Sequence, residues 1–337
     1  MSCAGLVGIF GGVNDIFDLA HLELWLAFGV AVVVLLLIDL LVAHRHAHVV
    51  SIREAAAWSA LWIGVSLLFN AGVWWLLGGQ RAMEFLAAYL VEKSLSVDNL
   101  FVFVVIFRTF GVGPIYQHRV LFWGVVGAIV MRVIMITAGV ALVHRFHWIL
   151  YLFGAFLVYT AVKLAMTAGQ EAHPEKSAAV RLARRWFRVA PGEHGEKFWA
   201  RSGGRLAPTM LFVTLIAIEI SDLIFAVDSI PTVFGISTDA FVIITSNIFA
   251  ILGLRALYFL LAGTIYRFHY LSHGLAVVLG FIGIKMLIGE LVEIPTWISL
   301  LVVAGVITIA ILLSLRMKKE EGRDSGPNPP PSGEIQP

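Results

Sequence analysis

Residues 208–232 read PTMLFVTLIAIEISDLIFAVDSIPT, an apolar run that carries three acids, Glu219, Asp222 and Asp228. A helix rises about 1.5 Å per residue, so a run of this length crosses a hydrocarbon core of roughly 30 Å. The run therefore predicts a membrane-spanning helix. The acids within it predict a functional polar site, because ionisable side chains are costly inside a bilayer.

The rest of the chain has the same apolar character. Of its 337 residues, 59% are hydrophobic and 14% are charged, and the mean hydropathy is +0.89. Soluble domains carry roughly 25% charged residues, so this composition excludes a water-soluble enzyme. The single cysteine excludes a disulfide framework and a thiolate metal site, which leaves oxygen and nitrogen atoms as metal ligands.

Apolar runs separated by charged breaks predict an all-α polytopic membrane protein with about nine transmembrane helices. The predicted spans lie near residues 22–43, 56–78, 84–107, 119–142, 148–168, 208–232, 240–263, 272–290 and 296–315. Seventeen of the 24 Lys and Arg residues fall in alternate loops, and only two fall in the loops between those. The positive-inside rule then predicts a multi-pass plasma (inner) membrane protein with its N-terminus outside and its C-terminus in the cytosol.

The chain also contains an internal repeat. Glu92-x5-Asp98-Asn99 has the spacing of Asp222-x5-Asp228-Ser229, and Arg132 and Arg255 follow the two motifs at a similar offset. Each copy would hold three spans, so the second copy would be inverted relative to the first, as in many secondary transporters. The predicted organisation is a two-helix segment 1–83, a first repeat 84–168, a basic cytosolic connector 169–207, a second inverted repeat 208–290, a final helix 291–321 and a disordered tail 322–337.

Charged residues inside the predicted spans do not balance. Six of them are acids, namely Asp39, Glu92, Asp98, Glu219, Asp222 and Asp228, against Lys93, Arg132 and Arg255. A buried surplus of negative charge must be protonated or neutralised by a bound cation. Oxygen ligands from these acids and from Asn99 suit Mn²⁺, Mg²⁺ or Ca²⁺. Arg132 and Arg255 would balance part of the charge, and ion pairs made only for helix packing remain an alternative for two of the acids.

Helical geometry restricts how these acids meet. On a straight helix Glu92 and Asn99 share a face while Asp98 points about 120° away, and the second motif behaves in the same way. The two acids of one motif would converge only on an interrupted helix, and Pro231 predicts an interruption just before it. If the third and sixth spans run antiparallel, four acids would face one cavity: Glu92, Asp98, Asp222 and Glu219.

The sequence resembles the TerC family of integral membrane proteins. The matching stretches are HRHAHVVS (44–51), EKSLSVDNLFVF (92–103), YQHRVLFWG (116–124), RFHWILYLFGAFLVYTAVK (145–163), EISDLIFAVDSIPT (219–232) and SNIFAILGLRALYFLLAG (246–263). The resemblance implies a multi-helix inner-membrane protein of the wider cation-exporter superfamily, with Mn²⁺ efflux as its activity and an association with tellurite resistance. Carried over by position, the resemblance implies that the functional acidic-motif residues are Asp39, Glu92, Asp98, Asn99, Glu219, Asp222 and Asp228.

These observations favour a secondary transporter that exports a divalent cation, with Mn²⁺ preferred, in possible exchange for protons. No permanently bound cofactor, no nucleic acid and no enzymatic activity are expected, and the expected partners are the lipid bilayer and the transported metal. One alternative is a membrane scaffold that aids the insertion or metal loading of secreted proteins. A more distant one is an intramembrane hydrolase with Asp98 and Asp228 as a dyad, although the chain contains neither G-x-S-x-G nor H-E-x-x-H.

Overall fold

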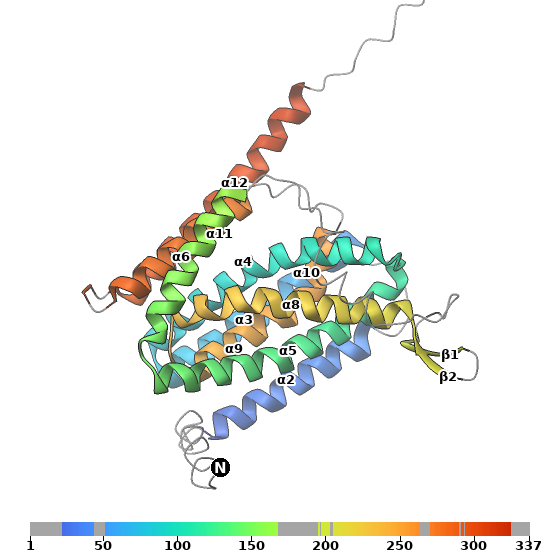
Figure 1. Ribbon diagram of the computed structural model, residues 1–337, viewed down its shortest axis with the longest axis horizontal. Coiled ribbons are helices and arrows are strands. Elements are labelled where there is room, and N and C mark those ends of the chain that lie inside the picture. The colour runs from blue at the N-terminus through green and yellow to red at the C-terminus, as the bar shows by residue number, and fades with distance from the viewer. Residues whose placement is uncertain are drawn as a thin grey trace, which may run out of the picture.

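The computed structural model describes residues 22–43, 51–167, 195, 197–202, 205–262, 270–289, 291, 292 and 294–324. Apart from one small hairpin, the regular structure in these ranges is helical (Figure 1). The elements are α2 (Leu22–Ala43), α3 (Ile52–Leu77), α4 (Gly79–Thr109), α5 (Pro114–Arg145), α6 (Ile149–Thr167), β1 (Trp199–Ser202), β2 (Arg205–Pro208), α8 (Met210–Phe234), α9 (Ala240–Leu252), α10 (Leu254–Leu261), α11 (Leu271–Ile288) and α12 (Thr296–Asp324).

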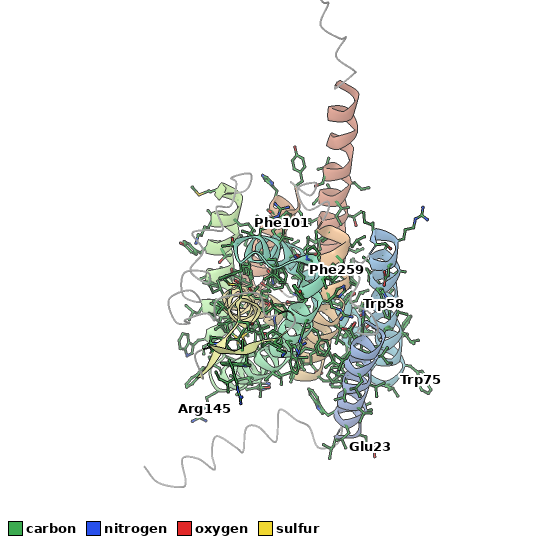
Figure 2. All side chains as sticks on the ribbon, turned by 90° about the vertical axis from the view of Figure 1, so that its right-hand side faces the viewer. Glu23, Trp58, Trp75, Phe101, Arg145 and Phe259 are labelled. Carbon is green, nitrogen blue, oxygen red and sulfur yellow. The ribbon has the colours of Figure 1, made fainter. Side chains whose placement is uncertain are left out.

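The prediction of an all-α polytopic membrane protein is confirmed, but the number nine is not. Among the described residues, seven helices are long and apolar enough to cross a membrane, and α9 with α10, bent by 40°, makes an eighth if the pair is one span. Helix α4 occupies the predicted span 84–107 but is not among the seven, and its middle carries the charged residues Glu92, Lys93 and Asp98. The bundle carries apolar side chains on its outside, such as Trp75, which projects from the surface and is 85% exposed (Figure 2).

Two predicted segments lie mostly outside the described residues. Only the end of the connector 169–207 is described, and it includes a hairpin in which Trp199 pairs with Pro208. The disordered tail predicted from residue 322 lies outside them beyond Asp324, where α12 ends.

The helices of the two predicted repeats pack against each other in a reciprocal pattern. Helix α4 packs mainly on α9, α5 packs mainly on α8, and α6 packs mainly on α11. In Figure 1, α4, α5 and α8 run alongside one another, while α6, α11 and α12 form a second group at one end. Each half is therefore incomplete without the other, and residues far apart in the chain meet at the interface.

Small residues let α6 and α11 approach closely. A Cβ atom added to Gly283 would lie 2.9 Å from the carbonyl oxygen of Gly154, and one added to Gly154 would lie 3.0 Å from the carbonyl oxygen of Gly283. Further along, a Cβ atom on Gly280 would lie 3.6 Å from the Cβ of Ala161. The order of these contacts shows that the helices are antiparallel. Close backbone approach of this kind is how membrane helices gain packing energy.

The helix interruption expected before Pro231 is not observed. Helix α8 continues through Pro231 to Phe234, and the Thr232 hydroxyl donates to the carbonyl oxygen of Asp228 at 2.8 Å. Pro231 lies in the last turn, where a missing N–H removes one hydrogen bond near the end of the helix. The break in the second half instead falls at Gly253, between α9 and α10.

Replacing Gly283 with Leu should destabilise the protein. The new side chain would overlap the backbone of α6, and overpacking of this kind costs about 1–3 kcal/mol. The matched control is Gly305→Leu in α12, because a Cβ atom there would have nothing within 4 Å. We expect Gly283→Leu to lower the melting temperature in detergent while the control stays near wild type. Equal melting temperatures for the two variants would contradict the close packing.

Candidate functional site

A buried arginine lies at the meeting point of the two halves. Arg132 of α5, 1% exposed, forms an ion pair with Glu92 of α4. Its Nη2 atom lies 3.3 Å from Oδ1 of Asp222 in α8, which forms a second ion pair. All three side chains are buried. One guanidinium therefore holds one acid from each predicted repeat.

The same guanidinium binds two neutral side chains. Its Nη1 atom donates to the Ser229 hydroxyl of α8 at 3.0 Å and to Oδ1 of Asn247 in α9 at 2.9 Å. The Arg132 cluster is defined here as Glu92, Arg132, Asp222, Ser229 and Asn247. Its members come from α4, α5, α8 and α9, so its geometry depends on the packing of all these helices.

The Arg132 cluster contains more acid than base. With both carboxylates ionised, Glu92 and Asp222 against Arg132 leave one negative charge. Oε2 of Glu92 is buried without a hydrogen-bond partner in the part of the chain that the structure describes. A buried, unpaired carboxylate oxygen next to surplus negative charge is a position that favours a cation.

The second buried arginine has a different partner. Nη2 of Arg255 in α10 forms an ion pair with Asp39 of α2 and also donates to the Asp39 carbonyl oxygen at 3.2 Å. Both side chains are buried. The pair is formally neutral and attaches one end of α2 to the bundle, while the other end is attached by the contact of Trp25 with Phe241, whose rings lie 5.0 Å apart.

The remaining predicted site residues lie in other surroundings. Glu219 lies one turn before Asp222 on α8 and lines an apolar cavity of about 540 Å³. Asp228 is turned toward α6, where it interacts with Lys163 and with the side chain of Thr160. Asn99 is buried, and the side chain of Asp98 lies outside the described residues.

The structure thus brings together Glu92 and Asp222 from the four acids expected to face one cavity. Within the described ranges, no three His, Cys, Asp or Glu side chains lie close enough to hold a metal ion together. Asp222 and Ser229 do share a face, as the helical spacing requires, since both contact Arg132. A cation site built from the described side chains would therefore combine two carboxylates with neutral oxygen atoms.

Two roles were not foreseen from the sequence, namely that of Asn247 in the Arg132 cluster and that of Lys93 at the end of α9. Asn247 belongs to the polar triplet Thr245-Ser246-Asn247 inside an apolar run, and this triplet was a usable signal. Lys93 donates through Nζ to the carbonyl oxygen of Ala250 at 3.1 Å, near the end of α9. This contact satisfies a helix-end carbonyl close to the break at Gly253, a role that its position in the sequence does not indicate.

A second cavity, of about 570 Å³, lies where α4 and α9 begin. Its wall contains the Arg81–Asp239 ion pair at 2.8 Å and a hydrogen bond from the Ser237 hydroxyl to Glu84 at 2.7 Å. Arg81 lies in the first turn of α4, in a stretch that the loop charges predict to be outside the cell. Because Arg81 and Asp239 are partly exposed, this pair differs from the buried pairs of the Arg132 cluster.

Comparison with known proteins agrees with the resemblance seen in the sequence. The model of the integral membrane protein TerC family matches residues 77–322. An uncharacterized membrane protein of Myxococcus xanthus is 50% identical over 87% of this chain and 92% of its own length. The proposed membrane-bound redox modulator Alx of Escherichia coli K12 is 46% identical over 90% of this chain and 97% of its own length. No solved structure matches the chain significantly.

Removing the buried Arg132 should destabilise the protein far more than removing an exposed arginine. In Arg132→Met, Glu92 and Asp222 would be buried without a partner, a loss of about 3–5 kcal/mol. The matched control is Arg81→Met, whose ion pair is 43% and 27% exposed and worth about 0–1 kcal/mol. Adding Glu92→Gln to Arg132→Met should restore part of the loss. Thermal unfolding in detergent measures all of these variants, and equal melting temperatures for Arg132→Met and Arg81→Met would refute the ion pairs.

Proposed function

Since the chain belongs to the integral membrane protein TerC family, we propose that it is a secondary transporter that exports a divalent cation, preferably Mn²⁺, across the plasma membrane. The observation that carries the proposal is the environment of Nη1 of Arg132. This one nitrogen contacts oxygen atoms of Glu92, Ser229 and Asn247, which belong to three different helices. The Arg132 cluster therefore already surrounds a positively charged group with oxygen ligands.

A metal ion could use the same atoms. Without Arg132, the two carboxylates would supply a charge of minus two, which matches a divalent cation. Carboxylate, hydroxyl and amide oxygens are the ligands of Mn²⁺, Mg²⁺ and Ca²⁺. In this proposal Arg132 is a tethered cation that pairs with Glu92 and Asp222 and offsets one of their two negative charges while the metal is absent, and it moves aside when the metal binds. The acids are then never buried without a counter-charge, which would be costly.

The packing of the halves supports an inverted repeat. Equivalent helices α6 and α11 run antiparallel, and the contacts of α4 with α9 and of α5 with α8 are reciprocal. The Arg132 cluster draws members from both halves. Substrate sites of transporters with inverted repeats lie at the interface between the copies. This placement favours transport over a scaffold role, for which a polar site in the interior has no use.

Proton exchange would follow from the ligands themselves. A carboxylate binds either a proton or the metal, so the export of one can be coupled to the import of the other. We further propose that the N-terminus lies outside and the C-terminus in the cytosol, as the loop charges predict. No catalytic step is proposed, and the scaffold role remains the competing hypothesis.

Flux measurements test the proposal directly. In liposomes that contain only this protein, we expect Mn²⁺ uptake that falls at least tenfold in Glu92→Gln and in Asp222→Asn, because each variant removes a charged ligand at nearly constant volume. The control is Glu54→Gln, in the first turn of α3. If wild-type liposomes show no flux of Mn²⁺, Mg²⁺ or Ca²⁺, the scaffold hypothesis replaces this one.

Competition between protons and the metal also predicts the direction of the pH dependence. Protonated acids cannot bind the cation, so Mn²⁺ affinity should rise between pH 6 and 8, and binding should release protons. Titration of the detergent-solubilised protein in weak buffer measures both quantities. Constant affinity without proton release would rule out exchange, although uniport through the same ligands would remain.

A further inference from the structure

Glu219 lies between the Arg132 cluster and an apolar cavity. The cavity, about 540 Å³ in volume, is formed by α5 and α8, and its lining includes Val130, Met131 and Leu215. A Cβ atom on Gly127 would overlap the Glu219 carboxyl group, so this group rests directly on the backbone of α5. The carboxyl group of Glu219 therefore lies against an apolar wall, and among the described residues the charged group that acts on it is Asp222 of the Arg132 cluster.

Several charged side chains on α8 and on the helices that pack against it are engaged with partners of their own. On its own helix, Asp222 is the nearest acid and interacts with it electrostatically. On α5, Arg132 binds Asp222 and Glu92 of α4. On α6, Lys163 interacts with Asp228, and on α11, Lys285 donates to Ser299 at 3.0 Å. The side chains described in β2, from residue 206 to 208, are uncharged.

Glu219 itself has no hydrogen bond or ion pair with the described side chains. An ionised carboxylate in such a position would lose hydration without gaining a counter-charge, and the negative charge of Asp222 would oppose it further. The neutral acid suits this position better. Glu219 thus differs from Glu92 and Asp222, which are held by a cation.

We propose that Glu219 is a proton-binding carboxyl group, separate from the cation ligands, that loses its proton when a metal ion enters the Arg132 cluster. This inference rests on the proposed transport function. Residues three apart on a helix have Cβ atoms about 5–6 Å apart, so Glu219 and Asp222 are close enough for strong electrostatic coupling. When a divalent ion takes the place of the arginine, the positive charge beside Asp222 grows and the ionised form of Glu219 becomes favourable. Its O–H bond then breaks, and the proton leaves to water.

The variant Glu219→Gln separates proton binding from metal binding. It mimics the neutral acid, so we expect Mn²⁺ affinity near wild type at acidic pH, where Glu219 keeps its proton in both states, a smaller rise of affinity with pH, and fewer protons released per bound ion. Glu92→Gln, measured alongside, should lose the affinity itself. If Glu219→Gln loses affinity at acidic pH as Glu92→Gln does, Glu219 is a metal ligand and the inference is wrong. Unchanged proton release would also overturn it.

A second measurement does not depend on transport. Dicyclohexylcarbodiimide is apolar and reacts with protonated carboxyl groups, whose O–H adds across its C=N bond. Mass spectrometry should find the label on Glu219, less of it at higher pH and less after Mn²⁺ is added. Val130→Trp, at an exposed position of the cavity lining, should reduce labelling, and Val162→Trp, at a similarly exposed position of α6, should not.

The results of the two measurements distinguish the proposals. An unlabelled Glu219 would overturn the inference while leaving metal binding by the Arg132 cluster intact. If the wild-type protein binds no cation, the proposed function fails, and the coupling of Glu219 to a metal fails with it. Labelling of Glu219 that is insensitive to Mn²⁺ in a protein that binds Mn²⁺ would show a protonated acid without coupling, which also contradicts the inference.

Discussion

The ion pairs of Arg132 with Glu92 and Asp222 are the contacts on which the site depends. Burial of charged groups costs several kcal/mol per ion, and this cost is offset only when the partners are held in good geometry. Arg132 reaches its partners because α4, α5, α8 and α9 are packed around it. The cluster therefore constrains these helices as much as the helices position the cluster, and both halves of the chain are needed for either.

The position of α4 also connects the Arg132 cluster to the break at Gly253, between α9 and α10. Lys93 follows Glu92 on α4 and donates to the carbonyl oxygen of Ala250, near the end of α9. Helix-end carbonyls inside a membrane need a partner because no water is available. Neighbouring residues of one motif thus serve two purposes, since Glu92 binds the arginine and Lys93 supports the break at Gly253. A change in the position of α4 would alter both.

Oxygen atoms that bind a guanidinium nitrogen are also suitable ligands for a metal ion, and this equivalence underlies the proposed transport. While no metal is bound, acids buried in a low-dielectric medium still need a counter-charge. In the proposed mechanism, a movable arginine keeps the acids paired while no metal is bound. The proposed protonation of Glu219 avoids an unpaired charge in a different way, since a carboxyl group in an apolar setting can keep its proton.

Local patterns in the sequence determined the membrane-spanning character, most of the helix positions, and which residues of a motif share a helix face. These features follow from the length of apolar runs and from the helical repeat, so they need no knowledge of neighbouring helices. Tertiary structure alone decided that Arg132 binds Glu92 and Asp222, that Arg255 binds Asp39, and that Asp228 faces Lys163. It also decided that α8 tolerates Pro231 while the chain bends at Gly253. Such pairings join residues of different helices, many of them distant in the chain, and they depend on how the helices pack, which the periodicity of a single helix does not specify.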